Sequence, residues 1–82
     1  MKGQLVIVRS YGNEPLIRRI WEVRNHLVYI INDEEYKKLT SGQRAIEPIG
    51  FPKEDVFKYS PEILKILNHN VEWSKLEQWY PE

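Results

Sequence analysis

Arginine and aromatic residues alternate through the first 31 residues of the chain, and together they could bind nucleic acid. Guanidinium groups contact phosphate, while an aromatic ring stacks on an unpaired base. The candidate nucleic-acid-binding residues are Arg9, Arg18, Arg19, Arg24 and Tyr29, with Trp21 as a second stacking ring. The alternative is that the arginines are solvated on the outer face of a sheet, their stems covering apolar surface, while Trp21 fills the core. We favour this alternative, and the salt dependence of binding separates the two.

A second group of aromatic residues could bind a protein partner. Trp73, Trp79 and Tyr80 lie within the last ten residues of the sequence. Tryptophan and tyrosine dominate the energetics of protein interfaces, so these three are candidate partner-binding residues. The other interpretation, which we prefer, is that the segment folds back over one open end of the sheet and buries its rings there.

The residues that usually carry catalysis do not converge in this sequence. His26 and His69 fall in different predicted elements, without a carboxylate at metal-ligand spacing. The absence of cysteine excludes thiolate chemistry, disulfides and Cys-based zinc sites. The glycines are too far apart for a phosphate-binding loop, and no serine lies in a nucleophile turn. We therefore expect no enzyme activity, no cofactor and no metal ion.

Two short acidic clusters, at residues 33–35 and 54–55, could bind a cation or act as an acid and base pair. Carboxylates at a helix start more commonly complement the positive end of the helix dipole. We expect that structural role for both clusters.

Composition and charge narrow the class of protein. The 82 residues, 41% of them hydrophobic, suit one folded domain over residues 1–82 and exclude a disordered chain. Twelve basic and twelve acidic residues give a net charge of zero, which argues against a strongly electrostatic nucleic-acid binder. The longest apolar run, Leu5 to Val8, is far too short to span a bilayer, and no signal-peptide pattern is present. We expect a cytoplasmic protein with no membrane partner.

The elements that position these residues begin with three predicted strands. Gln4 to Ser10, Leu16 to Arg24 and His26 to Ile31 are rich in β-branched and aromatic residues. A Gly-Asn-Glu-Pro turn and Asn25 separate them, so they form an antiparallel meander. In the second strand, we expect Ile17, Trp21 and Val23 to share the buried face.

The following segment is predicted to contain a short helix and a further strand. Asn32 and the acidic residues after it suit a helix start, and Thr40-Ser41-Gly42 suits its end. Ala45 to Ile49 is predicted as a strand interrupted by Pro48, which points to a sheet edge or a bulge. Gly50-Phe51-Pro52 is predicted as a bend.

Pro52 can begin one helical turn that delivers Val56 and Phe57 to the core. Ser60-Pro61-Glu62 predicts the start of a helix, because a hydroxyl N-cap precedes a proline and a carboxylate. Val71 to Tyr80 is predicted to add one or two helical turns.

The stretch Gly50-Phe51-Pro52-Lys53-Glu54-Asp55-Val56 resembles the end of an SH3 domain. In that family a glycine, an apolar residue, a proline, a one-turn helix and a valine close the barrel. The resemblance implies an SH3-like fold only, since Asp55 stands where the family places a peptide-binding tyrosine, and the acidic loop and first-strand aromatic motif are missing. An edge bend in a different α+β arrangement is the alternative.

These observations predict an α+β fold: an antiparallel meander curled into a small SH3-like partial barrel, with a short helix after the third strand. Residues 1–57 would form the β-rich core, and residues 58–82 a C-terminal helical extension packed on it. For function, we expect a non-enzymatic protein-interaction or assembly module that binds a protein partner or forms a homodimer. The alternative is a weak nucleic-acid-binding barrel that uses the arginine-bearing strands.

Overall fold

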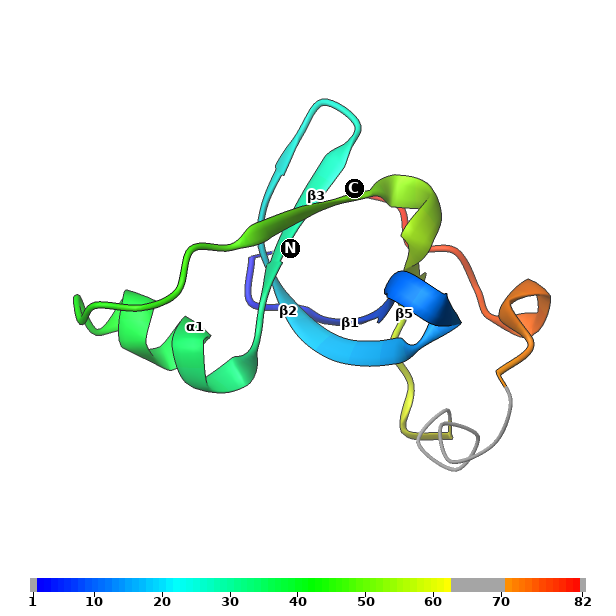
Figure 1. Cartoon of the computed structure of the whole chain (residues 1–82), viewed down its shortest axis with the longest axis horizontal. Coiled ribbons are helices and arrows are strands. Elements are labelled where there is room, and N and C mark those ends of the chain that lie inside the picture. Colours follow the sequence, from blue (N-terminus) through cyan, green and yellow to red (C-terminus); the bar gives the residue numbers. More distant parts are fainter. Residues whose placement is uncertain (1, 63–70, 82) are drawn as a thin grey trace.

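The computed structural model describes residues 2–62 and 71–81, and in them five antiparallel strands form one sheet (Figure 1). The strands follow the spatial order β4-β3-β2-β1-β5, so β4 and β5 are its two edges. Their bounds are β1 (Leu5–Arg9), β2 (Pro15–Arg24), β3 (Leu27–Ile31), β4 (Ile49–Pro52) and β5 (Val56–Lys58). The sheet is strongly curled, and in Figure 1 α1 (Asp33–Thr40) lies at the left end of the molecule and residues 71–81 at the right. The predicted α+β class and antiparallel meander are confirmed.

The turns of the meander depend on residues that tolerate a positive φ. Tyr11–Asn13 forms the 3-10 turn η1 between β1 and β2, with Gly12 at a φ of 73° and Asn13 at 60°. Asn25, at a φ of 53°, closes the tight connection from β2 to β3, as predicted. Glycine and asparagine adopt this backbone region at the lowest cost.

β2 changes the face that it turns toward the core partway along its length. Its register with β3 shifts between Ile20 and Glu22, which leaves Trp21 as the extra residue of a bulge. A bulge reverses the alternation of faces beyond it, so Ile20 and Val23 both reach the core. The prediction that Ile17, Trp21 and Val23 share one buried face is therefore wrong, because only Val23 of the three packs against the core cluster.

The core lies on the inner face of the curled sheet. Its buried members are Val6, Val8, Ile20, Val28, Ile30, Val56 and Trp79. Val56 and Phe57 are both buried, as predicted, because the 3-10 turn η2 (Lys53–Asp55) follows Pro52 and leads the chain into β5. On the outer face, Phe57 lies opposite Ile7 in the ladder and packs against the ring of Trp73.

α1 has the start and end that its sequence predicts. The side chain of Asn32 accepts a hydrogen bond from the backbone N–H of Glu35, which satisfies one unpaired donor of the first turn. Gly42, at a φ of 76°, lies in the turn just beyond the helix. Tyr36 packs edge-on against Trp21, so the helix covers the outer face of β2. Among the described residues, no helix is long and apolar enough to cross a membrane.

β4 begins later in the sequence than predicted. Residues 43–48 have no regular structure, and the strand runs through Gly50 to Pro52, where a bend was expected. Pro48 cannot donate to a ladder, so regular pairing with β3 starts only at Ile49, opposite Ile30. The predicted edge position is confirmed, since among the described strands β4 pairs with β3 alone.

Only part of the predicted C-terminal helical extension falls on described residues, namely 58–62 and 71–81. The helix predicted from Ser60 falls largely on residues 63–70, outside the described residues. Within 71–81 there is one 3-10 turn, η4 (Trp73–Lys75), and the chain then runs alongside β5. The backbone N–H of Lys58 donates to the Glu77 carbonyl at 2.8 Å, and that of Trp79 to the Val56 carbonyl at 3.1 Å. Pairing satisfies the edge of β5, which a helix there would leave open.

Candidate functional site

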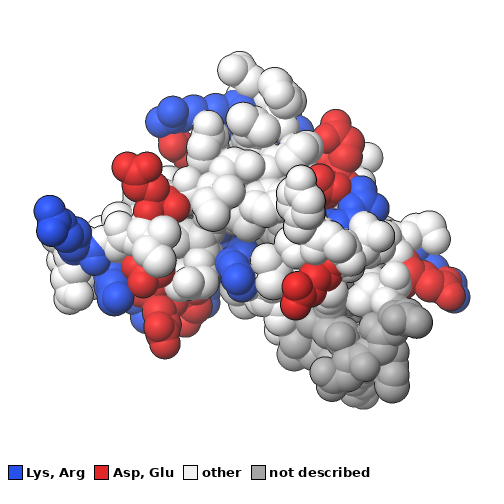
Figure 2. All heavy atoms as spheres, in the orientation of Figure 1, with Lys and Arg blue, Asp and Glu red and all other residues white. Residues whose placement is uncertain are grey.

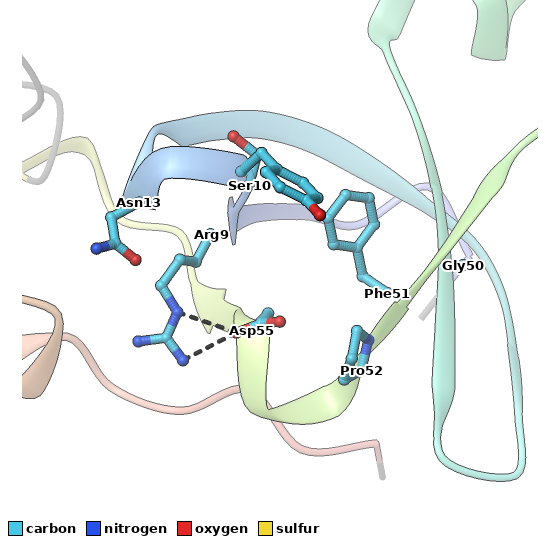
Figure 3. Close-up of a pocket in the computed structure, with 8 residues that line it drawn as sticks. Arg9, Ser10, Asn13, Gly50, Phe51, Pro52 and Asp55 are labelled. Carbon is cyan, nitrogen blue, oxygen red and sulfur yellow. Dashed lines mark hydrogen bonds and ion pairs between the residues drawn. The ribbon is translucent and has the colours of Figure 1, made fainter.

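Arg9, a predicted nucleic-acid-binding residue, is engaged within the molecule. Its guanidinium lies 2.8 Å from the Asp55 carboxylate (Figure 3). The same guanidinium lies 5.5 Å from the ring centres of both Phe57 and Trp73. The positive charge of Arg9 is thus already engaged by an ion pair and by cation–π contacts, so it is not free to bind a phosphate.

Arg19 and Arg24 are engaged in the same way. Arg19 pairs with Asp33, donates to the Gly3 carbonyl at 2.7 Å and lies over the Tyr36 ring. The Arg19 guanidinium, followed by Lys37, holds the pKa of the Asp33 carboxyl below its ordinary value.

Arg24 pairs with Glu22 at 2.9 Å, and its guanidinium lies 5.5 Å from the ring centre of Tyr29. The predicted stacking residue Tyr29 is thus itself a partner of an arginine. Arg18 differs from the other three, because it forms no ion pair with a described residue and lies on the opposite face of β2 from Arg19. The four predicted arginines therefore do not make one cationic surface, and basic and acidic groups are interspersed on the face in Figure 2.

The three predicted partner-binding aromatics lie in different environments. Trp79 is 3% exposed and belongs to the core, so within this molecule it is not accessible to a partner. Trp73 is half-buried, with its ring centre 5.1 Å from that of Phe57. Tyr80 is 70% exposed. For Trp79 the structure agrees with the interpretation that the segment folds back on the sheet.

A larger groove, the Tyr11 groove, lies between η1 and the start of η2 (Figure 3). It has a volume of about 520 Å³ and is lined by Arg9, Ser10, Tyr11, Asn13, Gly50, Phe51, Pro52 and Asp55. Tyr11 is fully exposed on the η1 turn. The Arg9–Asp55 ion pair forms one wall, so an apolar ligand would meet a satisfied pair of charges there.

A smaller apolar cleft, the Ile49 cleft, opens where β4 leaves the inner face of the sheet uncovered. Its volume is about 220 Å³, and it is lined by Leu16, Arg18, Ile30, Ile31, Asn32, Glu35, Ile46, Glu47, Ile49 and Phe51. Ile49 is on the core face of β4, opposite Ile30, and yet is 61% exposed. Ile46 beside it is 66% exposed. Two large aliphatic side chains thus face solvent over an opening that leads to the core.

The loop that carries Ile46 is held against α1 by a carboxylate. The backbone N–H of Ile46 donates to Glu35 Oε2 at 2.9 Å, and Lys38 Nζ donates to Glu35 Oε1 at 3.2 Å. These two contacts, the Ile46 amide first, hold the pKa of Glu35 below its ordinary value. The backbone of Ile46 is therefore anchored to α1, while its side chain is exposed.

The sequence analysis did not identify the Ile49 cleft. Ile46 and Ile49 flank Pro48 and carry no motif, and their pattern is that of an ordinary strand. Both side chains are exposed because the curled sheet brings no other described residue over them. No group of three His, Asp or Glu side chains that could hold a metal ion occurs in residues 2–62 and 71–81.

Comparison with known proteins finds no matching family model, no matching curated protein and no matching solved structure.

Proposed function

We propose that this chain is a non-catalytic protein-binding module with an SH3-like fold, and that it binds its partner over the Ile49 cleft. The observation that carries the proposal is the exposure of Ile46 and Ile49 beside an opening onto the core residue Ile30. Single exposed aliphatic residues are ordinary on protein surfaces, but adjacent ones that line a cleft are typical of interaction sites.

The fold part of the proposal is supported by strand order and by one turn. Five antiparallel strands with β5 beside β1, and a 3-10 turn between β4 and β5, are the arrangement that the resemblance at residues 50–56 implies. Asp55, which replaces the family's tyrosine, pairs with Arg9 in the wall of the Tyr11 groove. We do not propose that this groove binds proline-rich peptides.

Energetics favour a weak to moderate interaction. Full burial of an isoleucine side chain stabilises by about 1.5–3 kcal/mol, and Ile46 and Ile49 are both roughly two-thirds exposed. Covering both would contribute about 2–4 kcal/mol, which offsets only part of the entropy lost on association. The polar residues of the cleft, Arg18 and Glu47, would supply specificity.

The C-terminal aromatic residues are not part of this proposed binding surface. Trp79 serves the core, and Trp73 serves the outer face beneath Arg9. Nucleic-acid binding is not proposed, because three of the four candidate arginines already have carboxylate partners.

Site-specific photo-cross-linking tests the proposal. A benzophenone amino acid replaces Ile46 in one sample and Glu34, an exposed residue of α1 outside the cleft, in the control. In lysate of the cells that produce the chain, we expect discrete protein adducts from position 46 only. Excess unmodified chain should compete for adducts to any other protein, whereas excess Ile49→Lys chain should not. Equal adducts from both positions, or none from position 46, would contradict the proposal.

A further inference from the structure

We infer that the occupant of the Ile49 cleft is a second copy of this chain, docked across a two-fold axis. The inference rests on the proposed function and specifies its partner. A two-fold interface uses the same patch on both copies, so the patch must be complementary to itself. The charges of the patch indicate that it is, and the backbone edge of β4 argues against an extended peptide as the occupant.

The charges of the cleft are self-complementary. Arg18 and Glu47 both line it, and neither forms an ion pair with a described residue. Glu35, the other carboxylate of the cleft, is occupied by Lys38 and the Ile46 amide. In a two-fold dimer, Arg18 of each copy can face Glu47 of the partner subunit, so two equivalent ion pairs form. The chain has twelve groups of each sign, so the two copies carry no net charge to repel each other.

The backbone edge of β4 argues against an extended peptide as the occupant. The N–H of Lys53 donates to the His26 carbonyl of the neighbouring connection. Because hydrogen bonding alternates along an antiparallel ladder, residues 49 and 51 also point their backbone groups at β3, and residues 48, 50 and 52 point theirs outward. Two of those three are Pro48 and Pro52, which have no N–H.

Gly50 is thus the only outward donor along residues 48–52. A strand added at this edge would find one N–H where a ladder needs several, and prolines at an edge are a common defence against such addition. The contact over the cleft must therefore be made by side chains. This also prevents the copies from growing into an open-ended sheet.

The cleft has the volume to accept an aliphatic side chain. It measures about 220 Å³, and a cavity of roughly 150 Å³ is sufficient for benzene. We place Ile46 of one copy over the cleft of the other, with the reciprocal contact made at the same time. An interface centred on one such cleft is at the small end of the range, below about 1,200 Å², so we expect a dissociation constant on the order of 100 µM.

Sedimentation equilibrium of the full chain, from about 10 µM to about 1 mM, tests the dimer. We expect a monomer–dimer equilibrium that Ile46→Ser weakens at least tenfold, and that Glu34→Arg, a charge change outside the cleft, leaves unchanged. A monomer over the whole concentration range would overturn the inference. So would a dimer that Ile46→Ser does not weaken.

Charge exchange tests the arrangement of the two copies. Arg18→Glu and Glu47→Arg each place like charges across the two-fold axis, so each variant alone should be monomeric at 200 µM, a concentration on the order of the expected dissociation constant. Mixed in equal amounts, the two variants should form a heterodimer, because both cross-axis pairs are then of opposite sign. Absence of the heterodimer overturns the two-fold arrangement, provided that amide dispersion in NMR spectra shows both variants folded. If Arg18→Glu fails to fold, Arg18→Gln and Glu47→Gln replace the pair: each alone should self-associate more weakly than the unmodified chain, and the mixture should associate more tightly than either alone, because one Arg18–Glu47 pair is restored across the axis.

The mass of the cross-linked product separates this inference from the proposed function. Adducts from position 46 at twice the chain mass support the second copy. Adducts of another mass, with no self-adduct, overturn the dimer while leaving the cleft as a protein-binding site. The absence of any adduct specific to position 46 contradicts both.

Discussion

The indole Nε1 of Trp79 donates a hydrogen bond to the side-chain Oε1 of Gln4 at 3.3 Å, across 75 positions of sequence. The backbone of Gln4 is held in turn by β2, because its carbonyl accepts from the N–H of Ile20 at 2.9 Å. The segment after β5 is thus connected to the segment before β1, and the Trp79 ring covers the core between them.

Replacement of Trp79 by alanine should remove most of the stability of the fold. Truncation of a buried large aromatic residue costs about 3–5 kcal/mol, which is comparable with the whole stability of a small domain. Urea denaturation followed by circular dichroism measures the loss. Tyr80→Ala, at a residue that is 70% exposed, is the matched control and should change the free energy of unfolding by less than about 0.5 kcal/mol. A larger loss for Tyr80→Ala than for Trp79→Ala would show that the segment is placed differently.

Gly3→Ala should destabilise the fold more than Gly42→Ala. Both glycines have a positive φ, of 86° and 76°, so both substitutions carry a backbone cost of about 1–2 kcal/mol. At Gly3 the added Cβ would also meet the hydroxyl of Tyr36 at 2.6 Å, whereas at Gly42 no described residue outside the immediate chain neighbours comes within 4 Å.

Tyr36→Phe tests the cause of that difference. Removal of the hydroxyl takes away the closest atom and leaves the ring carbon behind it at 3.2 Å, so this substitution should recover part of the loss caused by Gly3→Ala. Thermal unfolding of Gly3→Ala, Gly42→Ala, Tyr36→Phe and the double variant Gly3→Ala/Tyr36→Phe gives the four losses of stability to compare. Equal losses at the two glycines would show that the backbone cost alone decides the effect.

Acid should weaken the attachment of α1 to the rest of the molecule. The pKa values of Asp33 and Glu35 are lowered from ordinary values of 3.8 and 4.5 by their hydrogen-bonding partners. A lowered pKa in the folded state means that the contribution to stability is present above the ordinary value and is lost as the pH falls through the folded one. The free energy of unfolding should therefore decline below about pH 4.5.

Denaturation curves between pH 7 and pH 2.5 measure this dependence. Asp33→Asn and Glu35→Gln should each flatten the acid limb, whereas Glu34→Gln, a charge removed from the same helix, should not. If the free energy of unfolding fell as steeply with acid in both variants as in the unmodified chain, the assignment of this acid sensitivity to Asp33 and Glu35 would be contradicted.

Because Glu35 also holds the Ile46 amide, Glu35→Gln should weaken association through the Ile49 cleft as well.

The chain should bind single-stranded oligonucleotides more weakly than about 100 µM, the weak limit of ordinary non-specific binding. The reason is that Arg9, Arg19 and Arg24 each have a carboxylate partner. Fluorescence anisotropy at low and at physiological salt measures the affinity. Tight binding that falls steeply with salt, and that Arg24→Gln reduces, would contradict the prediction.

Local signals in the sequence were sufficient for several elements. The Asn32 cap, the positive-φ residue Asn25 and the turn after Pro52 each depend on the conformational preference of one or two residues. Such preferences act whatever the rest of the chain does, so α1, the meander and η2 could be predicted. The edge position of β4 followed in the same way from Pro48, which lacks a donor.

Properties that depend on distant parts of the chain could not be read from the residues in order. The bulge at Trp21 lies where β2 has passed the end of its ladder with β1 and pairs with β3, and it reverses the faces that simple alternation assigns. That the C-terminal segment folds back was expected, but that it is Trp79 rather than Trp73 or Tyr80 that enters the core depends on how the edge of β5 pairs with this segment. Ile46 and Ile49 are exposed because the curled sheet brings no other described segment over them. Residue preferences decide how each short segment bends, whereas the packing of segments far apart in sequence decides which side chains are left for a partner.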